Sequence, residues 1–176
     1  MQFEPWVGEK YYSEGLGGVR VLAVGESHYA EPGLARRTFT SDVIRECVFE
    51  GRAAYFTKVA KLLNNLGSGD HMSDELLRDT WNRIAFYNFV QEMLPAPRVR
   101  PTEAMWKQAQ QLFPNLITQL RPQLIVVMGK ALREWFEPPS EIVVCFTEHP
   151  SSSRFSYQPW AENIRAAHSR VLLSAS

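Results

Sequence analysis

Two polar segments, GESHY at residues 25–29 and TEHPSSSRFSY at residues 147–157, carry the residue types that can do chemistry. They supply histidine, glutamate, serine and arginine, which transfer protons, donate hydrogen bonds or hold phosphate groups. Each segment directly follows a strongly apolar run, although over a hundred positions separate the two. When buried parallel strands end in such loops, the loops meet at the carboxyl edge of the sheet, where open α/β folds place their ligands. We therefore expect both segments to line one site.

Four short apolar runs, rich in β-branched and aromatic residues, predict the strands that position these loops. They are VRVLAVG at 19–25, IAFYNFV at 84–90, LIVVMG at 124–129 and IVVCF at 142–146. Three of the runs are nearly continuous instead of alternating, which indicates a sheet covered on both faces and therefore largely parallel. The expected sheet is central, mainly parallel and four-stranded.

Helical patterns fill the gaps between these runs. Apolar periodicity and capping residues predict helices over 53–67, 73–81, 103–120, 130–136 and 159–173. Gly67 is the expected stop of the first helix, and Ser73 and Thr102 are the expected caps of the second and third. Pro114 lies inside the third pattern, where it either kinks the helix or divides it in two.

The order of these elements predicts the fold. Strand, helices, strand, helix, strand, short helix, strand and helix describe a three-layer α/β/α sandwich with right-handed crossovers. The chain has 176 residues, which suits a single domain over 1–176 with one compact core.

Composition narrows the classes of partner and cofactor. Lys plus Arg equals Asp plus Glu at 19 each, so no overall charge marks a nucleic-acid or membrane-surface protein, although a neutral total can conceal a polarised face. Cys47 and Cys145 have no CxxC spacing, and the four histidines have no metal-ligand spacing, so we expect reduced thiols, no metal and no cofactor. We find no signal peptide and no apolar run of about 18 residues, and we expect a cytoplasmic protein.

The polar segments and their order along the chain resemble the uracil-DNA glycosylase superfamily over roughly residues 20–165. A GESHY-like loop follows the first strand, an Asn lies in the second, a Gly follows the third and HPS follows the fourth. In that superfamily the first loop reads like GQDPY, GxNPG or GEAPG and the last like HPSPLS, to which HPSSS at 149–153 is similar. RPTEAMW at 100–106 and LRPQLIVVMGKAL at 120–132 also resemble segments of the superfamily.

The resemblance implies a DNA glycosylase that hydrolyses the N-glycosidic bond of uracil or another deaminated base in base excision repair. The departing base gains negative charge, so the site needs a hydrogen-bond donor at the base and a water held near the sugar. His149 is the expected donor, and Glu26 or Ser27 is expected to position the water. Ser27 stands where the superfamily has an Asp or Asn, and His28 stands where it has a proline. The loop therefore departs from the superfamily pattern, and Ser27 cannot act as a carboxylate.

Four further residues are expected to bind the extruded base. Gly25 allows a close approach of the backbone. Tyr29 aligns with a tyrosine that excludes the methyl group of thymine in one branch of the superfamily. Phe39 resembles the phenylalanine on which the base stacks, or it is a core plug beneath its loop. Asn88 offers a donor and an acceptor to the edge of a base, or it is a structural Asn bonded to backbone.

The resemblance also implies a DNA-binding rim and a monomer that takes single- or double-stranded DNA with a flipped base. Arg154 and Phe155 are the expected wedge that replaces the extruded base. The expected phosphate contacts are Ser151, Ser152 and Ser153. Six cationic residues are expected to form either a positive rim or only dispersed surface charge: Arg36, Arg37, Arg98, Arg100, Lys130 and Arg133.

The sequence is also compatible with two other functions. The first is a catalytically weak or inactive module of the same fold that binds a nucleobase or nucleic acid, which the residues Ser27 and His28 favour. The second is an esterase that uses Ser27 with His28 or His149, although the chain has no GxSxG elbow and no clear acidic partner.

Overall fold

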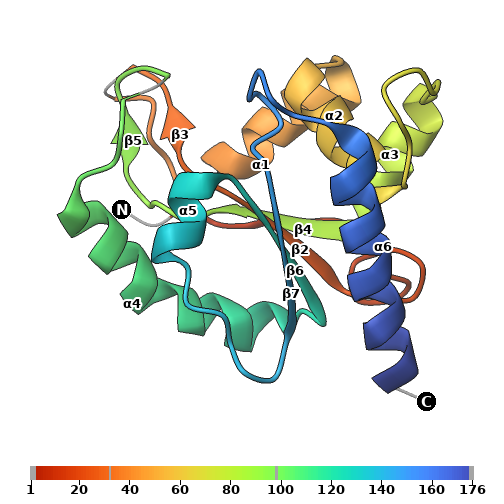
Figure 1. Cartoon of the computed structure of the whole chain (residues 1–176). Helices are drawn as coiled ribbons and strands as arrows, with labels where there is room; N and C mark the ends of the chain where they lie inside the picture. The colour runs from red at the N-terminus through yellow and green to blue at the C-terminus, as the bar shows by residue number, and fades with distance from the viewer. Residues whose placement is uncertain (1–2, 32, 98, 175–176) are drawn as a thin grey trace.

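The central sheet of the computed structural model, which describes residues 3–31, 33–97 and 99–174, has five strands in the order β1-β4-β2-β6-β7 (Figure 1). They are β1 Trp6–Val7, β2 Val21–Gly25, β4 Ile84–Asn88, β6 Leu124–Met128 and β7 Val143–Thr147. β2, β4, β6 and β7 pair in parallel, whereas β1 pairs antiparallel with β4. The four expected strands are confirmed. The prediction of a four-stranded sheet was wrong because two residues of β1 extend the sheet at its edge.

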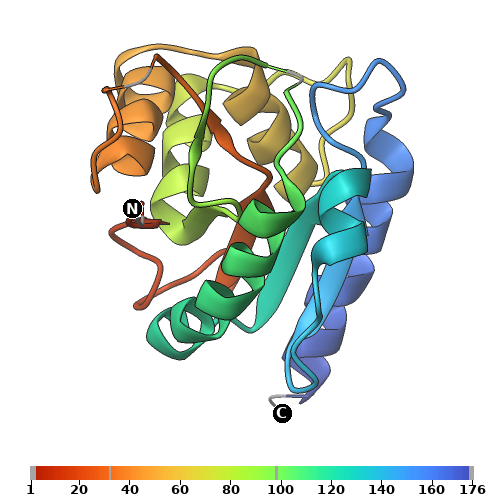
Figure 2. The ribbon, with the colours of Figure 1, turned by 90° about the vertical axis from the view of Figure 1, so that its left-hand side faces the viewer.

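Six α-helices and one π-helix accompany the sheet. They are α1 Phe39–Ile44, the π-helix η1 Arg45–Glu50, α2 Ala54–Leu63, α3 Asp74–Arg83, α4 Glu103–Leu120, α5 Lys130–Trp135 and α6 Tyr157–Ser174. One hydrophobic cluster joins alternate residues of β2, β4 and β6 to α1, η1, α2, α3 and α6, and a second cluster joins the intervening residues to α4 and α5. The chain is therefore a mixed α/β protein with helices packed against a mainly parallel sheet, as Figure 2 shows from the side of α4 and α5.

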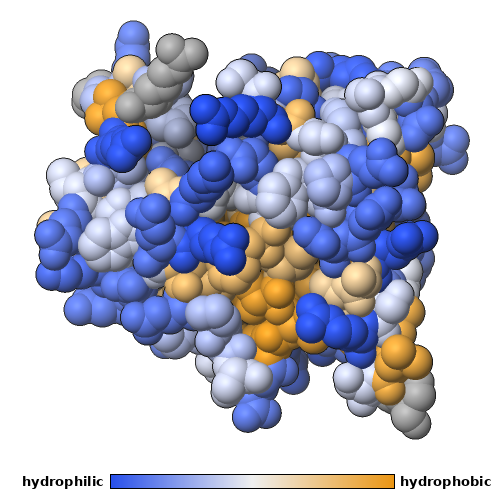
Figure 3. All heavy atoms as spheres, in the orientation of Figure 1, coloured by the Kyte–Doolittle hydropathy of each residue, from blue (hydrophilic) through white to orange (hydrophobic). Residues whose placement is uncertain are grey.

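The continuous apolar runs form strands because both faces of those strands are covered. Every residue of β2, β4 and β6 is buried, and neighbouring residues such as Ala23 and Val24 enter different clusters. The edge strand β7 is less covered. Val143, Val144 and Phe146 are only partly buried. Figure 3 shows hydrophobic residues gathered on the surface in the region of β7.

Local signals set most helix boundaries. The Ser73 hydroxyl accepts a hydrogen bond from the Leu76 backbone N–H at 3.1 Å, and the Thr102 hydroxyl accepts one from Met105 at 3.3 Å, so both predicted caps are confirmed. α4 passes through Pro114 as one element, so the helix is not divided. α2 ends at Leu63, four positions before the expected Gly67, because Asn65 already adopts a left-handed backbone with φ of 57°.

Two parts of the structure were not predicted. α1 and η1 occupy the segment after the first loop, where RRTFTSD has too many polar residues to show a helical stripe. A separate two-stranded parallel sheet pairs β3 His28–Tyr29 with β5 Met93–Leu94, and it links the loop after β2 to the loop after β4. Runs of two residues are too short for a pattern of alternation.

The described residues were compared with what a membrane span, a disulfide and a metal site require. No helix in that part of the chain is both long and apolar enough to cross a bilayer. Cys47 is half-buried, Cys145 is buried within β7, and neither forms a disulfide. Nowhere among the described residues do three or more His, Cys, Asp or Glu side chains gather as a metal site would require.

Candidate active site

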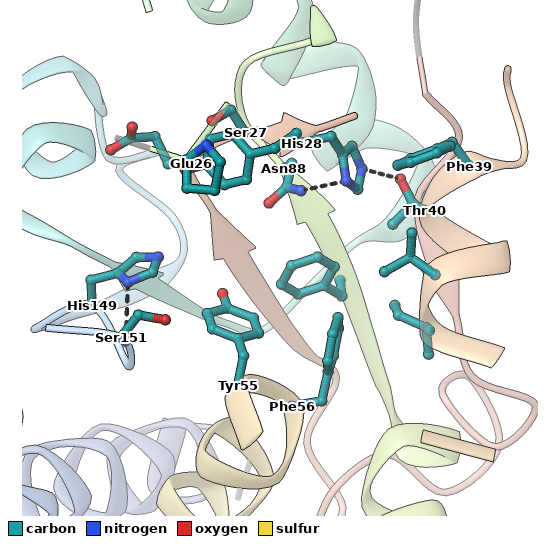
Figure 4. A pocket seen from close by; sticks show the side chains of 15 residues that line it. Glu26, Ser27, His28, Phe39, Thr40, Tyr55, Phe56, Asn88, His149 and Ser151 are labelled. Atoms are coloured by element: carbon teal, nitrogen blue, oxygen red, sulfur yellow. Dashed lines mark hydrogen bonds between the residues drawn. The ribbon is translucent and has the colours of Figure 1, made fainter. Parts of the chain in front are cut away.

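The two polar segments meet around one cavity at the carboxyl ends of the parallel strands. The cavity has a volume of about 360 Å³ and is lined by the loops after β2, β4 and β7 and by side chains of α1 and α2 (Figure 4). Eight residues that the sequence singled out line it: Glu26, Ser27, His28, Tyr29, Phe39, Asn88, His149 and Ser151. The expected convergence of distant loops is thus confirmed, because parallel strands deliver their following loops to the same edge.

Asn88 is the last residue of β4 and is 7% exposed. Its side-chain Nδ2 donates a hydrogen bond to His28 Nδ1 at 3.0 Å, and its backbone carbonyl accepts one from Gln91 at 2.6 Å. Its amide oxygen is directed away from His28, toward the side of the cavity that holds Tyr55 and His149 (Figure 4). The side chain is therefore bonded to another side chain, with its acceptor left at the cavity.

Gly25 makes room for that amide. A Cβ atom at position 25 would lie 2.3 Å from Asn88 Oδ1, closer than real Cβ atoms approach, and 3.1 Å from the Phe86 ring, which is a tight contact. The close approach expected at Gly25 is made by the protein's own Asn88 side chain. The loop that follows is held to β4 by backbone hydrogen bonds from Phe89 to Gly25 and from Val90 to Glu26, each 2.9 Å.

His28 forms part of the cavity wall and is 6% exposed. Its Nδ1 accepts from Asn88, so Nε2 carries the ring proton and donates to Thr40 Oγ1 at 2.9 Å. The rings of Phe3 and Phe39 meet it edge-on, with centroids 5.1 and 5.0 Å away. Burial lowers the pKa of His28 to about 4, so the ring is neutral at pH 7 and both nitrogens are occupied. His28 therefore cannot act as a base toward Ser27, which removes one form of the esterase reading.

His149 lies in the HPSSS turn after β7 and differs from His28 in having one nitrogen free. The backbone N–H of Ser151 donates to His149 Nδ1 at 3.1 Å, so the neutral ring carries its proton on Nε2. Figure 4 shows this second nitrogen turned to the cavity. Burial lowers the pKa of His149, although the nearby Glu148 opposes the shift. The result is a neutral hydrogen-bond donor at the cavity wall.

Gly129, directly after β6, adopts φ of 122°, a conformation that other residues rarely take. A Cβ atom there would lie 3.6 Å from His149 Cβ, an ordinary contact distance. The glycine is therefore required by its backbone conformation and not by lack of space. It turns the chain from β6 into α5 beside the HPSSS loop.

Glu26 and Ser27 contribute the polar groups of the first loop. Glu26 is half-buried, and burial raises the pKa of its carboxyl while Arg100 opposes the shift. Ser27 is 8% exposed, and its hydroxyl is the one buried side-chain polar atom among the described residues that has no hydrogen-bond partner. Buried hydroxyls are nearly always satisfied, so this group has unused capacity to bond water or a ligand.

Aromatic rings form the rest of the wall. Phe39 opens α1, is half-buried and lines the cavity with its ring edge against His28, so it is both packed and accessible to a ligand. Tyr55 and Phe56 from α2 and Phe86 from β4 also line the cavity. These three residues were not predicted to belong to the site. The Tyr55 ring lies 5.5 Å from that of His149, and burial raises the pKa of its hydroxyl, so Tyr55 stays protonated.

The remaining predicted DNA contacts lie outside the cavity. Ser153 and Arg154 are exposed, and the Ser152 hydroxyl donates to Glu148 at 3.4 Å and accepts from the Arg154 backbone. Phe155 packs against the core and the Tyr157 ring, so its ring is not free to act as a wedge in this conformation.

Most of the cationic residues expected at the rim are exposed, but some of them pair with acidic residues. Lys130 is exposed and lies 4.0 Å from Glu148. Arg36, Arg37, Arg100 and Arg133 are exposed, whereas Arg98 lies outside the described residues. Arg36 and Arg37 bond to Asp42 and Glu4 respectively, which leaves fewer uncommitted charges than the sequence suggests.

A scan against protein-family models finds no match, and no curated protein matches the sequence. The site therefore has to be understood from its own geometry. A neutral imidazole donor, an amide acceptor, a half-buried carboxylate and an unsatisfied hydroxyl surround an apolar, aromatic-lined space. That combination suits a flat ligand with a few polar edges.

Proposed function

We propose that the protein is a DNA glycosylase of the uracil-DNA glycosylase type, built on a three-layer α/β/α sandwich, that hydrolyses the N-glycosidic bond of uracil or another deaminated base. The observation that carries the proposal is the pairing of His149 and Asn88 on the wall of one cavity. His149 keeps a free Nε2–H, and the Asn88 amide oxygen is directed to the side of the cavity that holds His149 (Figure 4).

The volume of the cavity supports a ligand of the size of one nucleobase. At about 360 Å³ it lies near the lower end of the range of about 300–1,000 Å³ seen for small-molecule sites. Phe39, Tyr55 and Phe86 offer ring faces or edges to a flat heterocycle. A base within a duplex cannot reach such an enclosed space, so the nucleotide would have to be flipped out of the stack.

His149 has the protonation state that this reaction needs. Bond cleavage leaves negative charge on the departing base, and a fixed donor in a dry site stabilises developing charge strongly. Because burial lowers the pKa of His149, the ring is neutral at pH 7 and donates through Nε2 without giving up its proton. The hydrogen bond from Ser151 fixes which nitrogen donates.

Glu26 and Ser27 are the groups that would hold the attacking water. The raised pKa of the Glu26 carboxyl makes it a better general base than an exposed glutamate. The Ser27 hydroxyl, which has no partner among the described side chains and backbone groups, has capacity to orient the same water. Tyr29, Phe39 and Asn88 would contact the base, and Gly25 would leave room for the Asn88 amide, with no metal and no redox cofactor.

DNA would bind across the mouth of the cavity as a partner of a monomeric protein. Ser151, Ser153, Arg154 and Lys130 are exposed around the HPSSS turn and the start of α5. Hydroxyls and cationic side chains are the usual contacts to phosphates. Ser152 would act through the turn, since its hydroxyl is bonded within the loop, and Phe155 would have to leave its packed position to enter the duplex.

A second candidate function is a nucleobase-binding module that does not hydrolyse. One observation favours it: the Glu26 carboxylate is directed away from Asn88 in Figure 4, and the residue closer to the centre of the loop is a serine, which cannot act as a carboxylate. Recognition by Asn88 and His149 would then remain without activation of water.

Incubation of the pure protein with oligonucleotides that carry uracil, hypoxanthine, xanthine or a thymine mismatch tests the proposal. Alkali then breaks the strand at each abasic site. We expect breaks with at least one substrate, a large loss in His149→Ala and no loss in His71→Ala, an exposed histidine outside the cavity. Salt-sensitive DNA binding without breaks supports the binding module instead. Neither breaks nor binding overturns both functions.

A further inference from the structure

His28 is a buried, hydrogen-bonding residue of the cavity wall to which the proposed chemistry gives no role. It lies at the start of β3, and its partners come from elements far apart in the chain, Asn88 at the end of β4 and Thr40 in the first turn of α1. Both ring nitrogens are satisfied by side chains, as a buried imidazole requires, and one of these side chains is the amide of the proposed site. Its position next to Asn88 suggests that it acts on the amide.

The hydrogen bonds through His28 have one direction. An amide nitrogen can only donate, so His28 Nδ1 accepts from Asn88 and Nε2–H donates to Thr40 Oγ1. The order Asn88 to His28 to Thr40 therefore fixes the tautomer of the ring. With the ring proton on Nε2, the opposite rotation of the amide about its last bond is disfavoured, because it would place two acceptors, Asn88 Oδ1 and His28 Nδ1, against each other.

Packing keeps the ring in this orientation. Phe3 and Phe39 meet it edge-on from two elements, at 5.1 and 5.0 Å between centroids. The backbone N–H of Phe3 donates to the Gln91 side chain, which in turn donates to the Asn88 carbonyl at 2.6 Å. Burial keeps His28 neutral at pH 7 because it lowers the pKa to about 4, so Nδ1 remains an acceptor.

We propose that His28 and Thr40 are positioning residues that hold the Asn88 carboxamide with its oxygen at the cavity, so that the site selects a heterocycle that presents an N–H donor to Asn88 and rejects one that presents a ring-nitrogen acceptor. This inference rests on the proposed function, since it takes the cavity to be a nucleobase site. The free Nε2–H of His149 adds a donor, so the preferred ligand presents an N–H to Asn88 and a carbonyl oxygen to His149.

The tautomer can be measured without any ligand or activity. We expect the imidazole ¹⁵N spectrum of the full chain at pH 7 to show His28 protonated on Nε2 and unprotonated on Nδ1. Thr40→Ser keeps the acceptor hydroxyl and should keep this spectrum, whereas Thr40→Val removes the acceptor and should weaken the tautomer preference. A His28 ring protonated on Nδ1 in the unmodified protein overturns the inference, whatever the protein does to DNA.

Ligand selection is tested with two free bases that differ at this edge. 1-Methyluracil presents N3–H, whereas 1-methylpyrimidin-2-one, whose other ring nitrogen is likewise blocked, presents an unprotonated N3 and lacks the oxygen on C4. We expect calorimetry to show that the unmodified protein prefers 1-methyluracil by about tenfold or more, because the wrong base leaves a buried acceptor unpaired. In His28→Phe, which keeps a ring between Phe3 and Phe39 but frees the amide to rotate, the preference should fall to within about threefold.

The outcomes separate the inference from the function on which it rests. An unchanged preference in a folded His28→Phe protein overturns the positioning role, even if the unmodified protein cleaves DNA. If His28→Phe does not fold, the pair Thr40→Val and Thr40→Ser decides, since only the first should lose selectivity. If the unmodified protein binds neither base and cleaves no oligonucleotide, the proposed function fails and the selection argument fails with it, while the ¹⁵N spectrum still reports whether the amide is held.

Discussion

His28 and His149 line the same cavity, each shortly after a parallel strand of the central sheet, yet their rings are held in different ways. His28 is bonded on both nitrogens, to Asn88 and to Thr40, and it has no capacity left for a ligand. His149 is bonded on Nδ1 by the backbone of Ser151, two residues later, and its Nε2–H is free. Burial lowers the pKa of both rings, so both are neutral at pH 7.

The neighbouring structure, and not residue type or burial, therefore determines the different roles of these two histidines. His149 receives its hydrogen bond from its own tight turn, which leaves the other side of the ring open. His28 receives its bonds from two other elements, so its role depends on tertiary structure. One ring is suited to contact a ligand and the other to orient the residue that does.

The largest expected effect is on catalysis and concerns His149 alone. In His149→Ala the rate of base release should fall by about 100- to 1,000-fold, as for loss of one donor to a developing anion. In His149→Gln, which keeps an N–H donor, part of that loss should be recovered. Single-turnover strand cleavage measures both variants, with His71→Ala as the control. Equal rates in the alanine variant and the unmodified protein would remove His149 from the reaction.

The next effect is on stability and concerns His28. Its pKa is about 4 in the folded chain against an ordinary value of 6.5, so between these pH values the unfolded chain binds the proton more readily. Stability contributed by the neutral ring is therefore complete above pH 6.5 and is lost as the pH falls toward 4. The expected loss is about 3 kcal/mol, which urea unfolding at a series of pH values would measure.

The matched control for this pH effect is His28→Phe, which has no group that titrates in that range. Its free energy of unfolding should change by about 3 kcal/mol less than that of the unmodified chain between pH 6.5 and pH 4. The same slope in both proteins would show that the acid sensitivity arises elsewhere.

Two glycines give a smaller contrast between the same two regions. On the His28 side, Gly25→Ala would bring a Cβ atom to 2.3 Å from Asn88 Oδ1. We expect a destabilisation of about 3 kcal/mol, as for overpacking of a tight core, together with loss of uracil binding because the amide must move. Thermal unfolding and calorimetry test the two effects, and a variant that binds uracil normally would contradict this account of Gly25.

On the His149 side, Gly129→Ala has space but needs a backbone with φ of 122°. The expected cost is about 1–2 kcal/mol of backbone strain, with uracil binding retained because the new methyl group would meet His149 Cβ and Cδ2 at ordinary contact distances of 3.6 and 3.7 Å. A loss of binding as large as in Gly25→Ala would mean that the HPSSS loop depends on Gly129 for more than its turn.

The parallel strands and the convergence of the polar loops could be predicted from the sequence because both follow from local pattern. Continuous apolar runs such as that of β6 are required wherever both faces of a strand are covered, and the following loops must then share an edge. These patterns are enough to predict that Glu26, Asn88 and His149 share one cavity, as the structure shows. The chemical roles of these residues stay predictions.

The arrangement around His28 could not be predicted in the same way. Thr40 belongs to α1, whose sequence has no clear helical stripe, and the two-residue strands β3 and β5 have no pattern at all. Tyr55 and Phe56 lie in a helix that was correctly expected, but which of its residues face the cavity depends on how α2 crosses the end of the sheet. These features depend on contacts between elements and not on spacing along the chain.

The π-helix η1 has a consequence for which changes in length this region can tolerate. It follows α1 without a break, and Val48 of η1 and Ile44 of α1 are both buried in the same cluster. A π-helical turn contains about one residue more than an α-helical turn, so removal of one residue between positions 45 and 50 would convert the wide turn into an ordinary α-helical one and leave α1 in nearly the same orientation. Thr40 would then still meet the ring of His28, so this segment should tolerate the loss of one residue without losing that contact.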